Sequence, residues 1–138
     1  SDDLMEDISG VQYYENSYFN FVTETFFYED SLFISEKVFK PILFKQPFIV
    51  YSSPFTLKQL HRLGYKTFSE VIDESYDSEL DNSKRRKMIE QEITKLCNMT
   101  IEEIHEIYWS MKHIFDHNFK HFTRLIERGL DESIYRIW

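Results

Sequence analysis

Two short apolar runs, separated by one helix-length segment, constrain the fold of this chain most. Residues 18–23 and residues 47–51 are apolar nearly throughout, whereas a half-exposed strand would alternate apolar and polar residues. Strands covered on both faces have this continuous pattern, and they belong to parallel sheets. A parallel pair needs a crossover connection, which a helix beginning near Ser35 would supply. The pattern predicts strand, loop, helix and strand over residues 18–52.

The start of this predicted helix has the residue types of an N-terminus. Ser35 stands where a cap would satisfy an orphan backbone N–H, and Glu36 suits the positive end of the helix dipole. Pro41 indicates a kink, or a helix boundary near Lys40.

Further elements follow from caps and periodicity. We expect a helix over 55–63 that ends at Gly64, a short third strand over 66–68 and an acidic loop over 73–79. Beyond residue 80 the pattern is helical, with one helix over 84–97. A capping box at Thr100 then begins a long helix whose apolar stripe runs from Ile101 to Ile126. That helix is expected to end at Gly129, and a short last helix over 131–138 to pack back onto the domain.

These elements predict an α/β fold in one compact domain. Residues 1–80 would form a single Rossmann-like half-domain with a small parallel sheet, and residues 81–138 would form a C-terminal helical segment packed on it. A chain of 138 residues with 42% hydrophobic and 17% aromatic residues is large enough for a real core.

Composition narrows the function classes. A net charge of −8 makes nucleic acid a poor partner, because binding its phosphates needs a basic face. The basic run Lys84–Lys87 is interpreted as the solvated side of a helix start. No apolar run reaches the ~18 residues of a membrane span, and the acidic start does not suit a signal peptide. We therefore expect a cytoplasmic protein of a bacterium or a virus-infected host cell. Cys97 is expected to be a half-buried structural thiol.

Candidate ligand residues gather at one predicted edge of the sheet. Ligands of open α/β sheets bind at the carboxyl ends of strands, where a helix N-terminus offers free N–H groups to an anion. Glu24 follows the first strand, and Glu36 and Lys37 open the next helix. The alternative is that Ser35 and Glu36 only cap the helix and that Lys37 is solvated. The aromatic loop residues 26–28 either pack over the sheet edge or line a pocket.

Two other polar patterns have simpler interpretations. His113, His117 and His121 are spaced by four, so they share one helix face and could ligate zinc. That face lies nearly opposite the apolar stripe, which favours solvated imidazoles. The carboxylate pairs Asp73-Glu74 and Glu102-Glu103 are interpreted as caps or solvent-exposed groups.

Three segments together resemble the donor-binding half of GT-B glycosyltransferases, with the α1,3-fucosyltransferase-like pattern as the nearest. They are Phe21–Thr25, Phe33–Lys37 and Pro47–Val50, and the likeness covers roughly residues 17–80. Glu-Lys followed ten residues later by Pro-Phe-Ile is its most specific part. Similar modules occur in phage and viral proteins described as glycosyltransferases.

The resemblance implies a nucleotide-sugar site. Glu36 would accept hydrogen bonds from the ribose hydroxyls, Lys37 would face the diphosphate beside Ser35 and the helix N-terminus, and Glu24 would lie near the sugar or the base. Donors preorganised around the departing diphosphate would stabilise the transition state of hexosyl or fucosyl transfer. No divalent metal is expected, because no Asp-x-Asp motif precedes the helix.

The same resemblance leaves the enzyme incomplete. Thr25 and Phe26 replace the Asn and Ser of the family pattern, so base and sugar specificity do not carry over. A GT-B enzyme has two Rossmann-like domains, this chain has room for one, and no general base can be named. An N-terminal acceptor domain or a partner chain would complete the site. The alternatives are a non-catalytic protein-interaction module with the same fold, for which a homo-oligomer is expected, and an unrelated small α/β domain.

Overall fold

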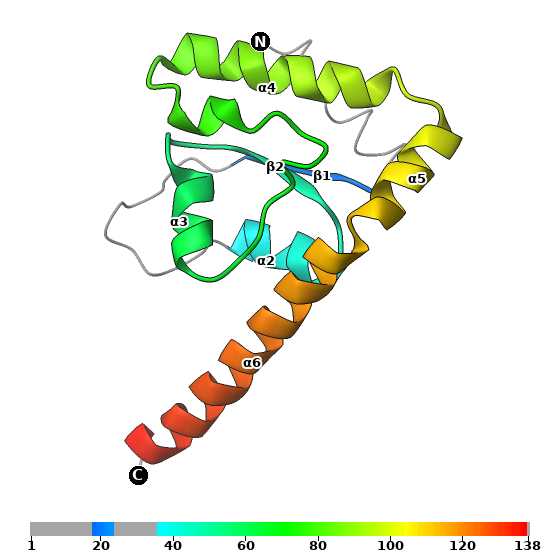
Figure 1. Cartoon of the computed structure of the whole chain (residues 1–138). Coiled ribbons are helices and arrows are strands. Elements are labelled where there is room, and N and C mark those ends of the chain that lie inside the picture. The colour runs from blue at the N-terminus through cyan, green and yellow to red at the C-terminus, as the bar shows by residue number, and fades with distance from the viewer. Residues whose placement is uncertain (1–17, 24–35, 138) are drawn as a thin grey trace.

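The computed structural model describes residues 18–23 and 36–137, and the side chains of residues 18–23 and 37–129 within them. The fold-class prediction is confirmed: a small parallel sheet with helices is followed by a helical segment (Figure 1). Ser35, Glu24 and the aromatic loop residues 26–28 lie outside the described residues.

The sheet consists of two parallel strands among the described residues. Strand β1 (Asn20–Thr23) pairs with β2 (Phe48–Tyr51), and Thr23 stands opposite Tyr51 in the register. Helix α2 (Glu36–Leu43) lies between them in sequence, so the predicted crossover is confirmed. Because the strands run parallel, their carboxyl ends meet at one edge of the sheet.

Helix α2 continues through Pro41 to Leu43, so of the two alternatives predicted at Pro41, a kink or a helix boundary near Lys40, the boundary is wrong. Proline removes one intrahelical N–H and disturbs the preceding turn. Burial offsets this cost, since Val38 and Ile42 are only 2% and 1% exposed on the face turned to the core.

Helix α3 (Thr56–Arg62) follows β2 and ends as predicted, with Leu63 as its C-cap and Gly64 beyond it. Gly64 has φ +94°, a left-handed conformation that glycine adopts at no steric cost. A Cβ there would lie 2.7 Å from the imidazole of His121, whose Nε2–H donates to the carbonyl of Leu63 at 2.6 Å. The turn therefore requires glycine for two independent reasons.

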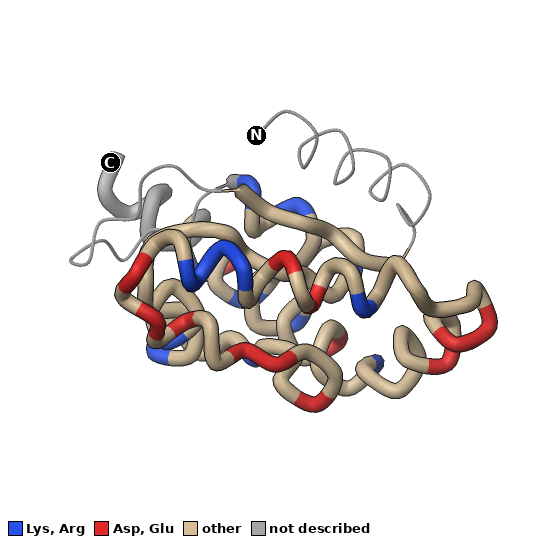
Figure 2. Tube along the Cα trace, turned by 90° about the horizontal axis from the view of Figure 1, so that it is seen from above, with Lys and Arg blue, Asp and Glu red and all other residues tan. Residues whose placement is uncertain are grey.

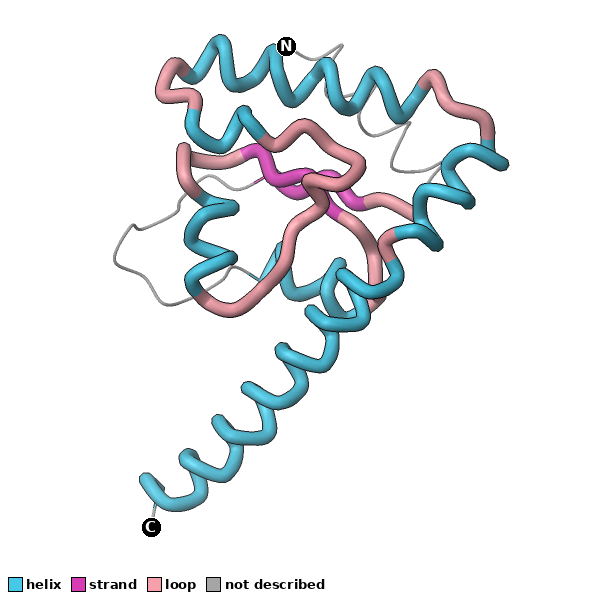
Figure 3. The backbone as a smooth tube through the Cα atoms, in the orientation of Figure 1, coloured by secondary structure: helices cyan, strands magenta, loops and turns pink. Residues whose placement is uncertain are grey.

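Residues 66–68 do not form the predicted third strand; they belong to a loop between α3 and the 3-10 helix η1 (Ser75–Ser78), as Figure 3 shows. The side chain of Asn118 explains the difference. Its Oδ1 accepts from the backbone N–H of Lys66 at 2.8 Å, and its Nδ2 donates to the carbonyl of Lys66 at 2.9 Å. The backbone groups that a neighbouring strand would use at Lys66 are thus bonded to a helix side chain.

Helix α4 (Asn82–Cys97) begins at the N-cap Asp81, whose carboxylate accepts from the N–H of Lys84. The expected solvated basic face is wrong for Arg85, which is 5% exposed. Its guanidinium donates to the carbonyls of Ser52 and Glu79, both at 3.0 Å, and so ties α4 to the end of β2. Elsewhere on the described chain basic and acidic residues are interspersed (Figure 2). Cys97 is exposed, so its predicted half-burial is also wrong.

The long C-terminal helix differs from the prediction at two points. Thr100 caps α5 (Ile101–Ser110) as expected, but the chain breaks at Met111 before α6 (Lys112–Ile137). The break turns α6 so that it packs on α2, with Phe39 and Phe122 rings 4.7 Å apart between centroids. Helix α6 then continues through Gly129 and projects past the α/β body (Figure 1). The predicted stop at Gly129 and the separate last helix are therefore wrong.

One core joins the two halves of the chain. Phe48 of β2 and Phe68 of the loop meet edge to face with centroids 5.0 Å apart, and both are buried. Leu96, Ile104 and Met111 from the helical segment belong to the same buried cluster. In the described part of the chain, no helix is both long and apolar enough to cross a membrane.

The two described glycines form a matched pair for mutation. Gly64→Ala should lower the free energy of unfolding by at least about 1–2 kcal/mol, because alanine is strained at positive φ and its Cβ displaces His121. Gly129→Ala should raise it by up to about 1 kcal/mol, since that helical position has no atom within 4 Å of an added Cβ. Urea unfolding of both variants measures the difference, and equal effects would contradict this view of Gly64.

Candidate functional site

The predicted ligand residues lie at the carboxyl end of β1, as far as the structure describes them. Lys37, in the first turn of α2, extends its Nζ to within 3.2 Å of the carbonyl oxygen of Thr23 and donates a hydrogen bond to it. Glu36 is the first residue of α2, but its side chain is outside the description, as are Glu24 and Ser35. The structure thus brings one of the four predicted residues to the predicted edge.

A hollow of about 250 Å³ runs beside β1 and reaches this edge. Its walls are residues 19–23 together with Lys37 and Lys40 of α2. The two lysines are three positions apart, so they share a face of the helix. Two ammonium groups beside backbone polar atoms form an environment that suits an anion. None of the described residues that line the hollow is a carboxylate.

At the second strand–helix junction, between β2 and α3, a side chain of the protein already binds the helix N-terminus. The carboxylate of Asp77 accepts from the backbone N–H groups of Leu57 and Lys58 at 2.8 and 3.1 Å, at the start of α3. An internal anion thus occupies the positive end of this helix. Sequence reasoning missed this role for Asp77. The available signal was that the residue before α3, Phe55, has no side-chain acceptor for a cap.

The solvated face that the sequence favoured is confirmed for His113, which is exposed, but His117 and His121 of α6 are half-buried. His117 donates from Nε2 to the carbonyl of Gly64 at 2.9 Å, one helical turn from the bond between His121 and Leu63. His113 contacts the carboxylate of Glu70 at 3.0 Å. Together with Asn118, they fasten α6 to the loop that follows α3. Among the described residues, no group of three or more His, Cys, Asp or Glu is placed to hold a metal ion.

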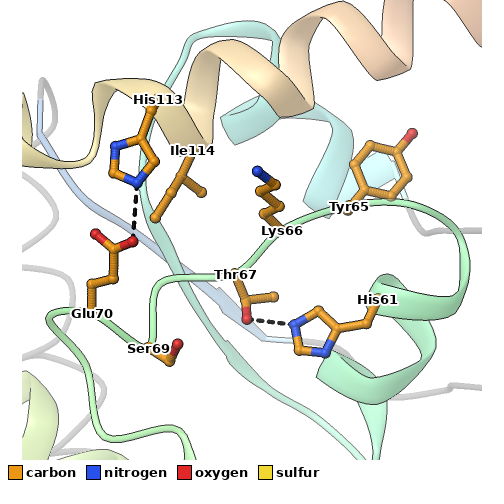
Figure 4. A pocket seen from close by; sticks show the side chains of 8 residues that line it. All are labelled: His61, Tyr65, Lys66, Thr67, Ser69, Glu70, His113 and Ile114. Carbon is orange, nitrogen blue, oxygen red and sulfur yellow. Dashed lines mark hydrogen bonds and ion pairs between the residues drawn. The ribbon is translucent and has the colours of Figure 1, made fainter.

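A second hollow, of about 320 Å³, lies between the end of α3, this loop and the start of α6 (Figure 4). His113 and Glu70 stand on one side of it. On the other side His61 Nε2 lies 2.7 Å from the hydroxyl of Thr67, which in turn donates to Glu74 Oε1 at 2.7 Å. Because the hydroxyl has one hydrogen, which it gives to Glu74, the His61 Nε2–H donates to Thr67.

Among the carboxylates that the sequence analysis interpreted as caps or solvent-exposed groups, Glu74 differs most from that prediction. Burial raises its pKa, while hydrogen bonds from Thr67 and from the backbone N–H of Phe68 act in the opposite direction, and the negative charge of Asp77 raises it further. The outcome is a half-buried acid that ionises less readily than an ordinary glutamate. It forms the inner end of the chain of hydrogen bonds that holds His61.

Comparison with known proteins adds no family assignment. The chain matches no family model, no curated protein and no solved structure. The likeness to glycosyltransferases therefore rests on the sequence motifs alone.

The raised pKa of Glu74 predicts a specific dependence of stability on pH. The folded state holds this proton more tightly than the unfolded state, so ionisation of Glu74 costs stability. This cost is absent below the ordinary value of 4.5 and grows as the pH rises through the higher native value. The free energy of unfolding of the wild type, minus that of Glu74→Gln, should therefore fall as the pH rises across this window. Urea unfolding from pH 4 upward tests this, and a difference that rises with pH would contradict it.

Proposed function

We propose that this chain is the nucleotide-sugar-binding portion of a glycosyltransferase, with its ligand in the hollow beside β1. What supports the proposal is that Lys37, the lysine of the Glu-Lys motif, lies at the carboxyl end of a parallel strand. Lys40 adds a second positive charge to the same hollow. A diphosphate is the ligand group that such a pair of cations would attract.

The proposed division of roles follows the chemistry of the leaving group. When a sugar is transferred, negative charge builds on the oxygens of the nucleoside diphosphate, and a nearby ammonium group stabilises that charge. Lys37 and Lys40 would bind and neutralise the diphosphate, and Glu36 would accept hydrogen bonds from the ribose. The general base and the acceptor site would come from another domain or chain.

Calorimetric titration with uridine and guanosine diphosphates tests this function. At least one of them should bind, and Lys37→Gln should weaken binding by about 1–3 kcal/mol, the loss of a hydrogen bond to a charged group. Lys40→Gln should also weaken binding. Glu36→Ala should weaken the binding of nucleotides that carry ribose hydroxyls. Lys120→Gln, an exposed lysine on α6, removes the same charge elsewhere and should leave binding unchanged. Absence of binding at millimolar concentration by folded protein would overturn the proposal.

A protein-interaction role is the second candidate, favoured by the exposed outer part of α6. Leu125 and Ile126 are each 44% exposed, on a helix that projects beyond the α/β body (Figure 1). Apolar side chains grouped on a projecting helix favour association. On this function the chain should sediment as an oligomer at micromolar concentration, and Leu125→Glu with Ile126→Glu should yield monomers. A wild-type monomer throughout that range would contradict self-association through this surface.

A further inference from the structure

The outer part of α6 has an exposed surface that is both basic and apolar. Leu125 and Ile126 are each 44% exposed, and Arg124 and Arg128 are exposed beside them. The two arginines are four positions apart and Leu125 is three before Arg128, so these side chains are neighbours on the helix. Neither guanidinium has a hydrogen-bond or ion-pair partner among the described residues. This surface therefore offers two unpaired positive charges next to apolar groups, on a chain whose net charge is −8.

Helix α5 has the complementary combination of charge and apolar surface. It carries Glu102, Glu103 and Glu106 but no lysine or arginine. Glu103 is bonded to Thr100 at the N-cap. The carboxylates of Glu102 and Glu106 are exposed and have no partner within the described part of the chain. Trp109 is 50% exposed and stands three positions beyond Glu106, so it lies on the same face of the helix.

These two surfaces cannot meet within one molecule. Helix α6 is continuous from Lys112, which places Arg124 about 18 Å along the helix axis at 1.5 Å per residue. Helix α5 ends at Ser110, next to the start of α6, and Figure 1 shows the outer turns of α6 projecting away from it. The unpaired charges of α5 and α6 can therefore neutralise each other only between separate molecules.

We propose that the outer turns of α6 dock on α5 of a second copy of this chain; the inference rests on the protein-interaction role above and commits it to one partner. Arg124 and Arg128 have the same spacing as Glu102 and Glu106, so two ion pairs can form side by side and fix the orientation of the contact. Trp109 adds the apolar anchor, because exposed tryptophan and arginine side chains contribute strongly to interfaces.

Such a contact joins two different surfaces, so it is heterologous. Each copy that binds through α6 keeps its own α5 face free for another copy. The assembly therefore grows with concentration as an open chain or closes into a ring, whereas a pair of α6 helices packed on each other would stop at a dimer.

Charge-swap variants test this pairing by analytical ultracentrifugation. The α6 variant carries Arg124→Glu and Arg128→Glu, and the α5 variant carries Glu102→Lys and Glu106→Lys. For each variant alone the dissociation constant of self-association should rise at least ten-fold, because like charges then face each other. An equimolar mixture should associate again, since each variant provides the charges that the other now requires. All four positions are exposed, so both variants should keep the wild-type melting temperature.

Lys84→Glu with Lys87→Glu reverses two exposed charges on α4 and should associate as the wild type does. A wild type that stays monomeric throughout the micromolar range would overturn both the self-association role and this inference. If the wild type associates, two results would overturn the inference alone. They are an α5 variant that associates as strongly as the wild type, and a mixture of the two variants that remains monomeric.

Discussion

The bond pair between the side chain of Asn118 and the backbone of Lys66 is the constraint on which much of this structure depends. The sheet has two strands among the described residues, and backbone polar groups that pack beside it need partners. Asn118, 1% exposed, provides both partners at Lys66 from α6 instead of from a third strand. This contact sets α6 against the loop. It thereby brings His121 so close to Gly64 that a Cβ there would displace the imidazole, and it holds Lys66 at the wall of the second hollow.

Local patterns allowed much of the fold to be predicted. Continuous apolar runs indicated the parallel pair, and the Thr100 capping box located the start of α5. Hydrogen-bond partners that lie far apart in the sequence could not be predicted, because no local residue pattern indicates which of them meet. Asn118 and Lys66 are 52 positions apart, and Arg85 and Ser52 are 33 apart. The length of α6 was also underestimated: Gly129 was interpreted as a stop, yet a glycine with helical backbone angles only weakens a helix.

The two strand–helix junctions contrast in a way that the sequence did not show. At the start of α3 the carboxylate of Asp77 takes the position that an external anion would occupy. Beside β1, Lys37 and Lys40 line a hollow instead. Because Asp77 already fills the junction at α3, the nucleotide site is proposed at the first junction, beside β1. The residues that resemble the glycosyltransferase motif also lie there. The sequence predicted that Lys37 lies at this edge, and the spacing of three between Lys37 and Lys40 could have added Lys40 to the candidates. The hollow around Lys66 could not be predicted, since it depends on how α6 packs against the loop.

Hydrogen exchange at the backbone amide of Lys66 tests the central role of the Asn118 contact most directly. The Lys66 amide donates to the side-chain oxygen of Asn118, so it should exchange only when α6 separates from the loop, and its protection reports that contact. The account predicts that Lys66 exchanges as slowly as the amides of β2 in the wild type, and much faster in Asn118→Ala. Exchange of the wild-type Lys66 amide at the rate of an exposed loop residue would contradict it.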